Sequence, residues 1–110
     1  MRRTRVWARL LGVKGVTVEE VAAEEDEDGE LAAIVVAVRV PRRETGRCGV
    51  CRRRGPGYDQ GEGRRRWRAL DLGTVPTFLE AEAPRMRCLE HGVVVVAVPW
   101  ARHGAGYTRS

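Results

Sequence analysis

The chain has 110 residues, the length of one small domain, and only 5% of them are aromatic, so its core must consist mainly of Val, Leu and Ala. Arg9 interrupts the apolar start and no cleavage site follows it, which argues against an export signal, and the apolar run Val93–Pro99 is too short to span a bilayer. These features predict a cytoplasmic protein with no membrane partner, in which cysteines more often bind metal or do chemistry than form disulfides.

Charge is unevenly distributed along the chain, whose net charge is +5. Residues 1–40 hold six basic and eight acidic side chains (−2), whereas residues 41–110 hold fourteen arginines and seven acidic side chains (+7). The excess in the second part indicates an anionic partner, for which nucleic acid is the usual candidate. Because Lys14 is the only lysine, codon usage that favours arginine is an alternative explanation of the composition, although it does not explain the clustering.

The first part of the chain predicts one helix and one hairpin. Apolar residues at helical spacing in residues 4–11 predict a short helix. Residues 16–25 and 31–40 are rich in β-branched residues and predict two strands, joined by a turn in which Gly29 supplies a positive φ. The acidic cluster Glu24–Glu30 is then the solvated tip of this hairpin.

The second part predicts further strands. Residues 52–63 contain four glycines and one proline and must form a loop. Residues 64–72 predict a strand with Trp67 in the core, and residues 77–88 predict another, in which Pro84 marks an edge position or a bulge. Residues 92–100 predict a last strand covered on both faces, followed by a tail without pattern at residues 101–110.

Two cysteine pairs with matching spacing carry the strongest chemical signal. The pattern is C-x2-C-x36-C-x2-H, and it uses all three cysteines of the chain and one of its two histidines. Zinc prefers four tetrahedral ligands, and three thiolates with one imidazole are an ordinary structural set. We therefore predict a structural zinc ion bound by Cys48, Cys51, Cys88 and His91.

Three alternatives stand beside this prediction. The thiols could be buried without a ligand, although two matched spacings would then be coincidence. A redox CxxC should end a strand and open a helix that lowers a thiol pKa, whereas a loop rich in Gly and Arg follows here. A catalytic zinc would need an open coordination position, which four protein ligands do not leave.

Arginines gather in three groups around the predicted zinc site. Alternate residues of a strand lie about 6.6 Å apart, so one group would form a regular row of guanidinium groups, suited to phosphate oxygens. The alternative is a solvated face. The predicted nucleic-acid contacts are Arg52, Arg53 and Arg54; Arg64, Arg66 and Arg68; and Arg85 and Arg87.

The sequence resembles the N-terminal zinc-finger region of bacterial ISL-three-family insertion-sequence transposases. The resemblance rests on "RLLGVKGVTVEEV", "RCGVCRRRGPGYD", "RRRWRALDLG", "RMRCLEHG" and "VPWARHGAGYT", in family order over nearly the whole chain. It implies a zinc region that helps to bind the ends of the element, normally followed by a helix-turn-helix and a DDE catalytic domain. His91 stands where many members have a fourth cysteine.

Together these observations predict an α+β fold that is mostly β, with a helix and hairpin in residues 1–44, a zinc-ribbon-like unit in residues 45–100 and the tail. The expected function is binding of DNA at transposon ends, without catalytic residues of its own and without a small-molecule substrate. The alternative from another class is a protein-interaction module that pairs transposase subunits through Val-rich strands. A thiol oxidoreductase using Cys48 and Cys51 is a third.

Overall fold

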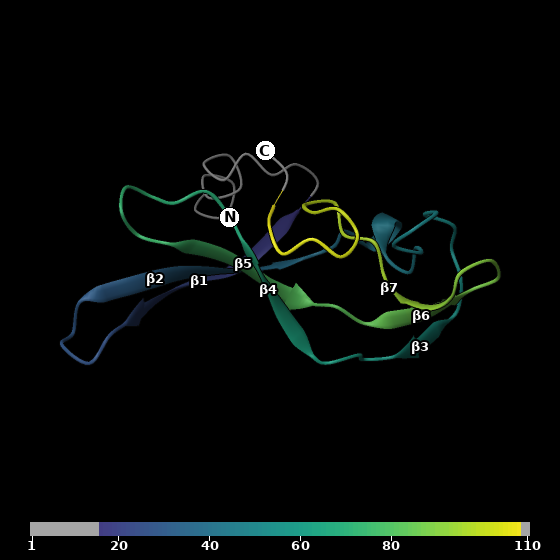
Figure 1. The fold of residues 1–110 in the computed structure, drawn as a ribbon, viewed down its shortest axis with the longest axis horizontal. Helices are drawn as coiled ribbons and strands as arrows, with labels where there is room; N and C mark the ends of the chain where they lie inside the picture. The colour runs from purple at the N-terminus through teal and green to yellow at the C-terminus, as the bar shows by residue number, and fades with distance from the viewer. Residues whose placement is uncertain (1–15, 109–110) are drawn as a thin grey trace.

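A computed structural model describes residues 16–108, which form seven strands and a single 3-10 turn arranged in two sheets (Figure 1). The predicted helix at residues 4–11 lies outside the described residues. The described part of the chain is mostly β, and the predicted α+β class is therefore wrong, since the only helical element in it is the 3-10 turn η1 (Arg42–Glu44). In this part there is also no helix of the length and apolarity needed to cross a membrane.

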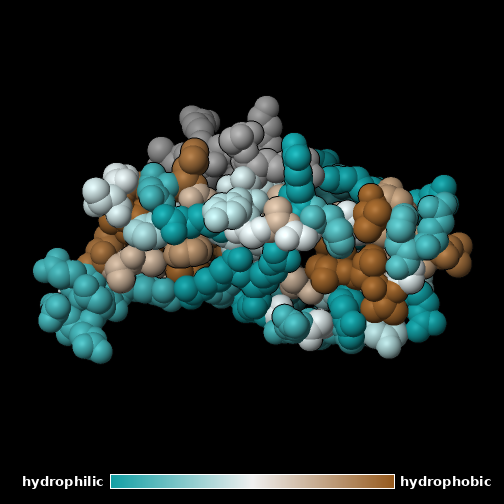
Figure 2. Space-filling view, in the orientation of Figure 1, coloured by the Kyte–Doolittle hydropathy of each residue, from teal (hydrophilic) through white to brown (hydrophobic). Residues whose placement is uncertain are grey.

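The predicted hairpin is confirmed. Strands β1 (Thr17–Glu25) and β2 (Leu31–Arg39) pair antiparallel, and the turn between them contains Gly29 at φ 79°. Asp26 caps this turn, because its Oδ1 accepts hydrogen bonds from the backbone N–H groups of Asp28 and Glu30 at 2.9 Å. The tip projects from the body of the protein as a hydrophilic surface, at the left of Figure 2.

The larger sheet has the strand order β1-β2-β5-β4. Strand β5 (Thr77–Glu82) pairs parallel with β2 and antiparallel with β4 (Arg64–Arg68), so it lies between strands from both parts of the chain. The larger sheet thus joins strands from both sides of the predicted domain boundary at residue 44. That residues 1–44 and 45–100 fold independently of each other stays a prediction.

The smaller sheet has the order β3-β6-β7, formed by β3 (Gly57–Asp59), β6 (Arg85–Cys88) and β7 (Gly92–Val95). The prediction of one strand over residues 77–88 is wrong, because the chain leaves the larger sheet before Pro84 and enters the smaller one after it. A proline cannot donate to a strand ladder, which explains the break at this position. The loop prediction for residues 52–63 missed only the short β3.

The last predicted strand is also too long. Strand β7 ends at Val95, and Val93 is 37% exposed, so the strand is not covered on both faces. The chain instead turns, and Val98, Trp100 and Ala101 pack onto the larger sheet. The tail is not patternless either, because the Arg68 N–H donates to Gly106 O at 2.8 Å and continues the sheet with a short parallel bridge to Tyr107.

Two separate cores result. The main core lies on one face of the larger sheet, where Val36, Leu79 and Trp67 occupy one row across three strands and are almost fully buried. Trp100 meets Trp67 edge to face with ring centroids 5.3 Å apart, a favourable aromatic geometry. The second core contains only Cys48, Met86 and Cys88 as buried residues and surrounds the predicted zinc ligands.

Candidate metal centre and adjoining basic surface

The first cysteine pair lies in a tight turn held by backbone hydrogen bonds. The Cys48 N–H donates to Arg53 O, and the Arg52 N–H donates back to Cys48 O, both at 2.8 Å. A bridge between Cys48 and Val96 ties this turn to the chain that leaves β7. We call residues 48–54 the first knuckle. Its Cys48 side chain is fully buried at the centre of the second core.

The second cysteine–histidine pair lies in the turn between β6 and β7. Cys88 ends β6 and pairs with Gly92, which begins β7 with a φ of 71°. Glycine adopts this conformation without steric cost. His91 therefore lies three residues after Cys88, on the same turn, and we call residues 88–92 the second knuckle.

All four predicted ligands come together. Their ligand atoms lie within 4.8 Å of one another, with Cys48 Sγ 3.7 Å and Cys88 Sγ 3.5 Å from His91 Nδ1, and Cys51 Sγ 3.6 Å from Cys88 Sγ. Zinc bonds of about 2.3 Å to sulfur and 2.0–2.1 Å to nitrogen place neighbouring ligand atoms of a tetrahedron about 3.5–3.8 Å apart. The side chains thus fit a zinc ion bound through His91 Nδ1.

The surroundings of Cys48 and Cys88 favour thiolates, the form that binds metal. The pKa of Cys51 is raised instead, because the hydrogen bond from the Arg53 backbone, which lowers it, is outweighed by burial and by the neighbouring Cys88 and Cys48 side chains. The backbone N–H of His91, followed by its imidazole, lowers the pKa of Cys88 to about 6. Burial would raise the pKa of Cys48, but the backbone N–H groups of Cys51 and Val50 outweigh it and the pKa is lowered. All three cysteines are free, and a loop rather than an α-helix follows Cys51, as expected for a metal site and not for a redox pair.

Gly49 is required for a reason that the sequence did not reveal. A Cβ built there would lie 2.4 Å from His103 Nδ1 and 2.6 Å from Val95 O. The first knuckle is therefore in close contact with β7 and with residues 96–108, which we call the C-terminal segment. We expect Gly49→Ala to lower the free energy of unfolding of the zinc-loaded chain by about 1–3 kcal/mol in urea titrations. Gly57→Ala is the matched control, since nothing lies within 4 Å of its added Cβ; equal losses in both variants would contradict this explanation.

The first group of predicted DNA contacts is exposed on the first knuckle. Arg53 Nη1 lies 3.3 Å from Glu90 Oε1, and Arg54 Nη2 donates to Arg43 O at 2.5 Å. Arg52 has no carboxylate partner among the described residues. It is also the only described non-glycine residue with a positive φ, at 66°.

The predicted row on β4 exists but is paired with acids. The side chains of Arg64 and Arg66 both bind Glu80, at 2.9 and 2.8 Å, and Arg66 also forms two hydrogen bonds with Glu24. Hydrogen bonds from Arg66 and then Arg64 lower the pKa of Glu80, so this carboxylate stays charged. Arg68 binds Asp71 at 2.8 Å. Sequence reasoning missed Glu80 and Glu24 because their positions depend on the sheet order, whereas Asp71 lies only three residues from Arg68.

The third group lies on β6. Arg85 Nε donates to Asp59 Oδ1 at 2.8 Å, and the guanidinium groups of Arg85 and Arg87 lie 5.2 and 5.3 Å from the Tyr58 ring centroid. Arg87 is exposed and has no carboxylate partner in the described part of the chain. Arg52, Arg54 and Arg87 are thus the predicted contacts that have no carboxylate partner among the described residues.

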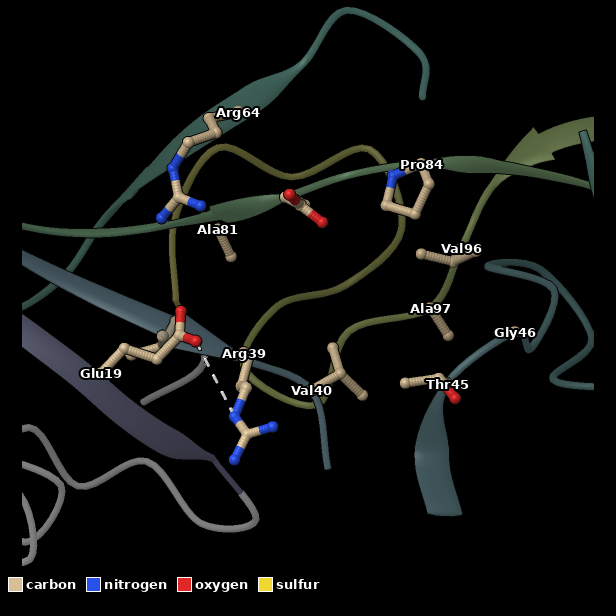
Figure 3. Close-up of a pocket in the computed structure, with 12 residues that line it drawn as sticks. Glu19, Arg39, Val40, Thr45, Gly46, Arg64, Ala81, Pro84, Val96 and Ala97 are labelled. Carbon is tan, nitrogen blue, oxygen red and sulfur yellow. Dashed lines mark ion pairs between the residues drawn. The ribbon is translucent and has the colours of Figure 1, made fainter. Parts of the chain in front are cut away.

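Two pockets adjoin the zinc region. The first, of about 350 Å³, lies where the sheets meet and has both charge signs at its rim, with an ion pair of 3.9 Å between Arg39 Nε and Glu19 Oε2 (Figure 3). The second, of about 210 Å³, is lined by residues that the sequence analysis did not assign as contacts, namely Arg65, Arg102 and His103, together with Arg52. The sequence signal that could have indicated this pocket is Arg65, because it lies on the same strand face as Trp67.

Two β-hairpin-like knuckles that bring three cysteines and one histidine to one point define a zinc-ribbon domain. Residues 44–91 match the sequence model described as "zinc-finger of transposase IS204/IS1001/IS1096/IS1165". The resemblance seen in the sequence is thereby confirmed.

Curated relatives agree with this assignment. The chain is 51% identical over 98% of its length to proteins named transposase for insertion sequence element IS1557, from Mycobacterium tuberculosis strains CDC 1551 / Oshkosh and ATCC 25618 / H37Rv. It spans about a quarter (24%) of the length of these relatives. No solved structure matches the chain.

Proposed function

We propose that this chain binds DNA as the zinc-ribbon part of an insertion-sequence transposase and that its DNA is the end of the element. The observation that carries the proposal is the basic surface around the metal centre, since residues 41–110 hold fourteen arginines and seven acidic residues. Arginines on the first knuckle and on β6 lie beside the ligands that fix both elements. The names of the relatives support the same reading, and such an activity belongs in the bacterial cytoplasm.

The proposed contribution is binding and not chemistry. Two-metal strand transfer requires carboxylates gathered around a pair of cations. Eight of the fifteen acidic residues lie in Glu19–Glu30, on the β1–β2 hairpin, and others are engaged with arginines. This distribution supports a role in positioning DNA.

Salt dependence of binding tests the proposal. The zinc-loaded chain should bind a labelled duplex with a logarithmic salt slope near −5 if about six phosphates are engaged. A duplex with a terminal repeat of a related element and a scrambled duplex of equal length separate end recognition from non-specific binding. No salt-sensitive binding to either duplex would contradict the proposal.

A second candidate function is pairing of transposase subunits. Apolar side chains at the two knuckles are exposed, namely Leu89 (103%), Val50 (49%) and Val93 (37%). Figure 2 shows apolar surface gathered at this end of the protein. A pairing module would show a molecular mass that rises with concentration in sedimentation experiments and responds little to salt.

A further inference from the structure

The second pocket differs from the rest of the basic surface in its charge balance. Arg52, Arg65, Arg102 and His103 line it, and among the described residues of its lining none carries a carboxylate. The row on β4, by contrast, is bound to Glu80, Glu24 and Asp71. An anion entering this pocket therefore displaces no internal partner, whereas an anion at the row competes with carboxylates already in place.

One arginine of the pocket is held in place with N–H groups left for a ligand. Arg65 Nη2 donates to Ala105 O at 2.6 Å and its guanidinium lies 5.0 Å from the Trp67 ring centroid, so this side chain is held in position. A guanidinium has five N–H donors, which leaves several of them free. Among the described residues Arg52 and Arg102 form no ion pair.

The backbone of Arg52 gives a second, independent observation. A left-handed conformation is unfavourable for a non-glycine residue, because its Cβ comes too close to the following carbonyl oxygen, and glycine would occupy the same place without this cost. The structure nevertheless has arginine at φ 66°, on the wall of this pocket. The strain is explained if the guanidinium is needed there.

We propose that this pocket holds a phosphate group, through Arg52, Arg65, Arg102 and His103, and that the group is a phosphodiester of bound DNA. This inference rests on the proposed function. A pocket of about 210 Å³ has room for a phosphate group with part of its hydration shell. The walls come from the first knuckle, β4 and the C-terminal segment, so DNA binding here would be coupled to the zinc-dependent fold.

Binding of a labelled duplex by the double variant Arg52→Gly/Arg102→Gln tests the proposal. Glycine accepts the positive φ at position 52, so the fold should be retained, and zinc content and amide spectra check this. We expect the salt slope to become shallower by about 2 and the affinity to fall about tenfold at low salt, equally for both duplexes. Arg39→Gln/Arg42→Gln removes the same charge outside the pocket and should change both quantities much less. Equal effects of the two double variants would overturn the proposal.

A titration with inorganic phosphate at constant ionic strength separates the pocket from the proposed function. In the wild-type chain we expect saturable NMR shifts of the Gly49 amide, the His103 ring and the Trp67 indole, and their loss in Arg52→Gly/Arg102→Gln. If the wild-type chain binds phosphate but no duplex, the proposed function fails and the phosphodiester assignment with it, leaving a site for free phosphate. If phosphate causes no such shifts, the pocket is not an anion site.

Discussion

Removal of zinc by a chelator is expected to unfold the two knuckles and the smaller sheet. Two of the three buried residues of the second core, Cys48 and Cys88, are predicted ligands, so little apolar surface remains there to replace the metal. Structural zinc contributes about 10–16 kcal/mol in apparent terms, which matches the whole stability of a typical small domain. The ion is thus expected to supply most of the stability of the two knuckles and the smaller sheet.

Amide NMR spectra with and without metal measure this effect residue by residue. We expect loss of dispersed signals from residues 46–60 and 85–96, with the β1–β2 hairpin signals least affected. Cys48→Ser should give the same result with zinc present, whereas Leu89→Ala should bind one zinc and keep the native spectrum, because Leu89 is fully exposed on the same knuckle as His91. Unchanged dispersion in the metal-free chain would show that zinc does not hold this half together.

The metal ligands could be predicted from the sequence because their geometry is local. A two-residue spacing places both side chains of each pair on one turn, and the ion itself requires the two turns to meet. The hairpin was predictable for the same reason, since Gly29 and the flanking β-branched residues define it within 25 residues of chain.

The remaining fold depends on contacts between distant residues. Nothing in residues 77–82 indicates that β5 pairs parallel with β2, and this pairing decides which acids face the arginines. Glu24 meets Arg66, forty-two residues away, because β1, β2, β5 and β4 follow one another across one sheet. A regular row of arginines on one strand therefore did not establish that their charges are free.

The sequence analysis also underestimated how much the C-terminal segment contributes to packing. It assigned the main core to strands, whereas Trp100, which lies after the last strand, packs into that core. Trp100 is 1% exposed and stacks edge to face on Trp67. We expect Trp100→Ala to lower the free energy of unfolding by about 3–5 kcal/mol, because the large cavity it leaves on the covered face of the larger sheet can close only partly. Urea titration of the zinc-loaded variant, followed by circular dichroism, measures the loss.

A control in the same segment separates packing from a general effect of C-terminal substitution. Tyr107 pairs with Arg68 through its backbone, but its side chain is 72% exposed. Tyr107→Ala should therefore change the free energy of unfolding by about 0.5 kcal/mol or less. If Trp100→Ala lowered the free energy of unfolding as little as Tyr107→Ala, the larger sheet would be stable without the C-terminal segment. Residues 101–104, which form one wall of the phosphate pocket, would then not be held in position by the packing of Trp100.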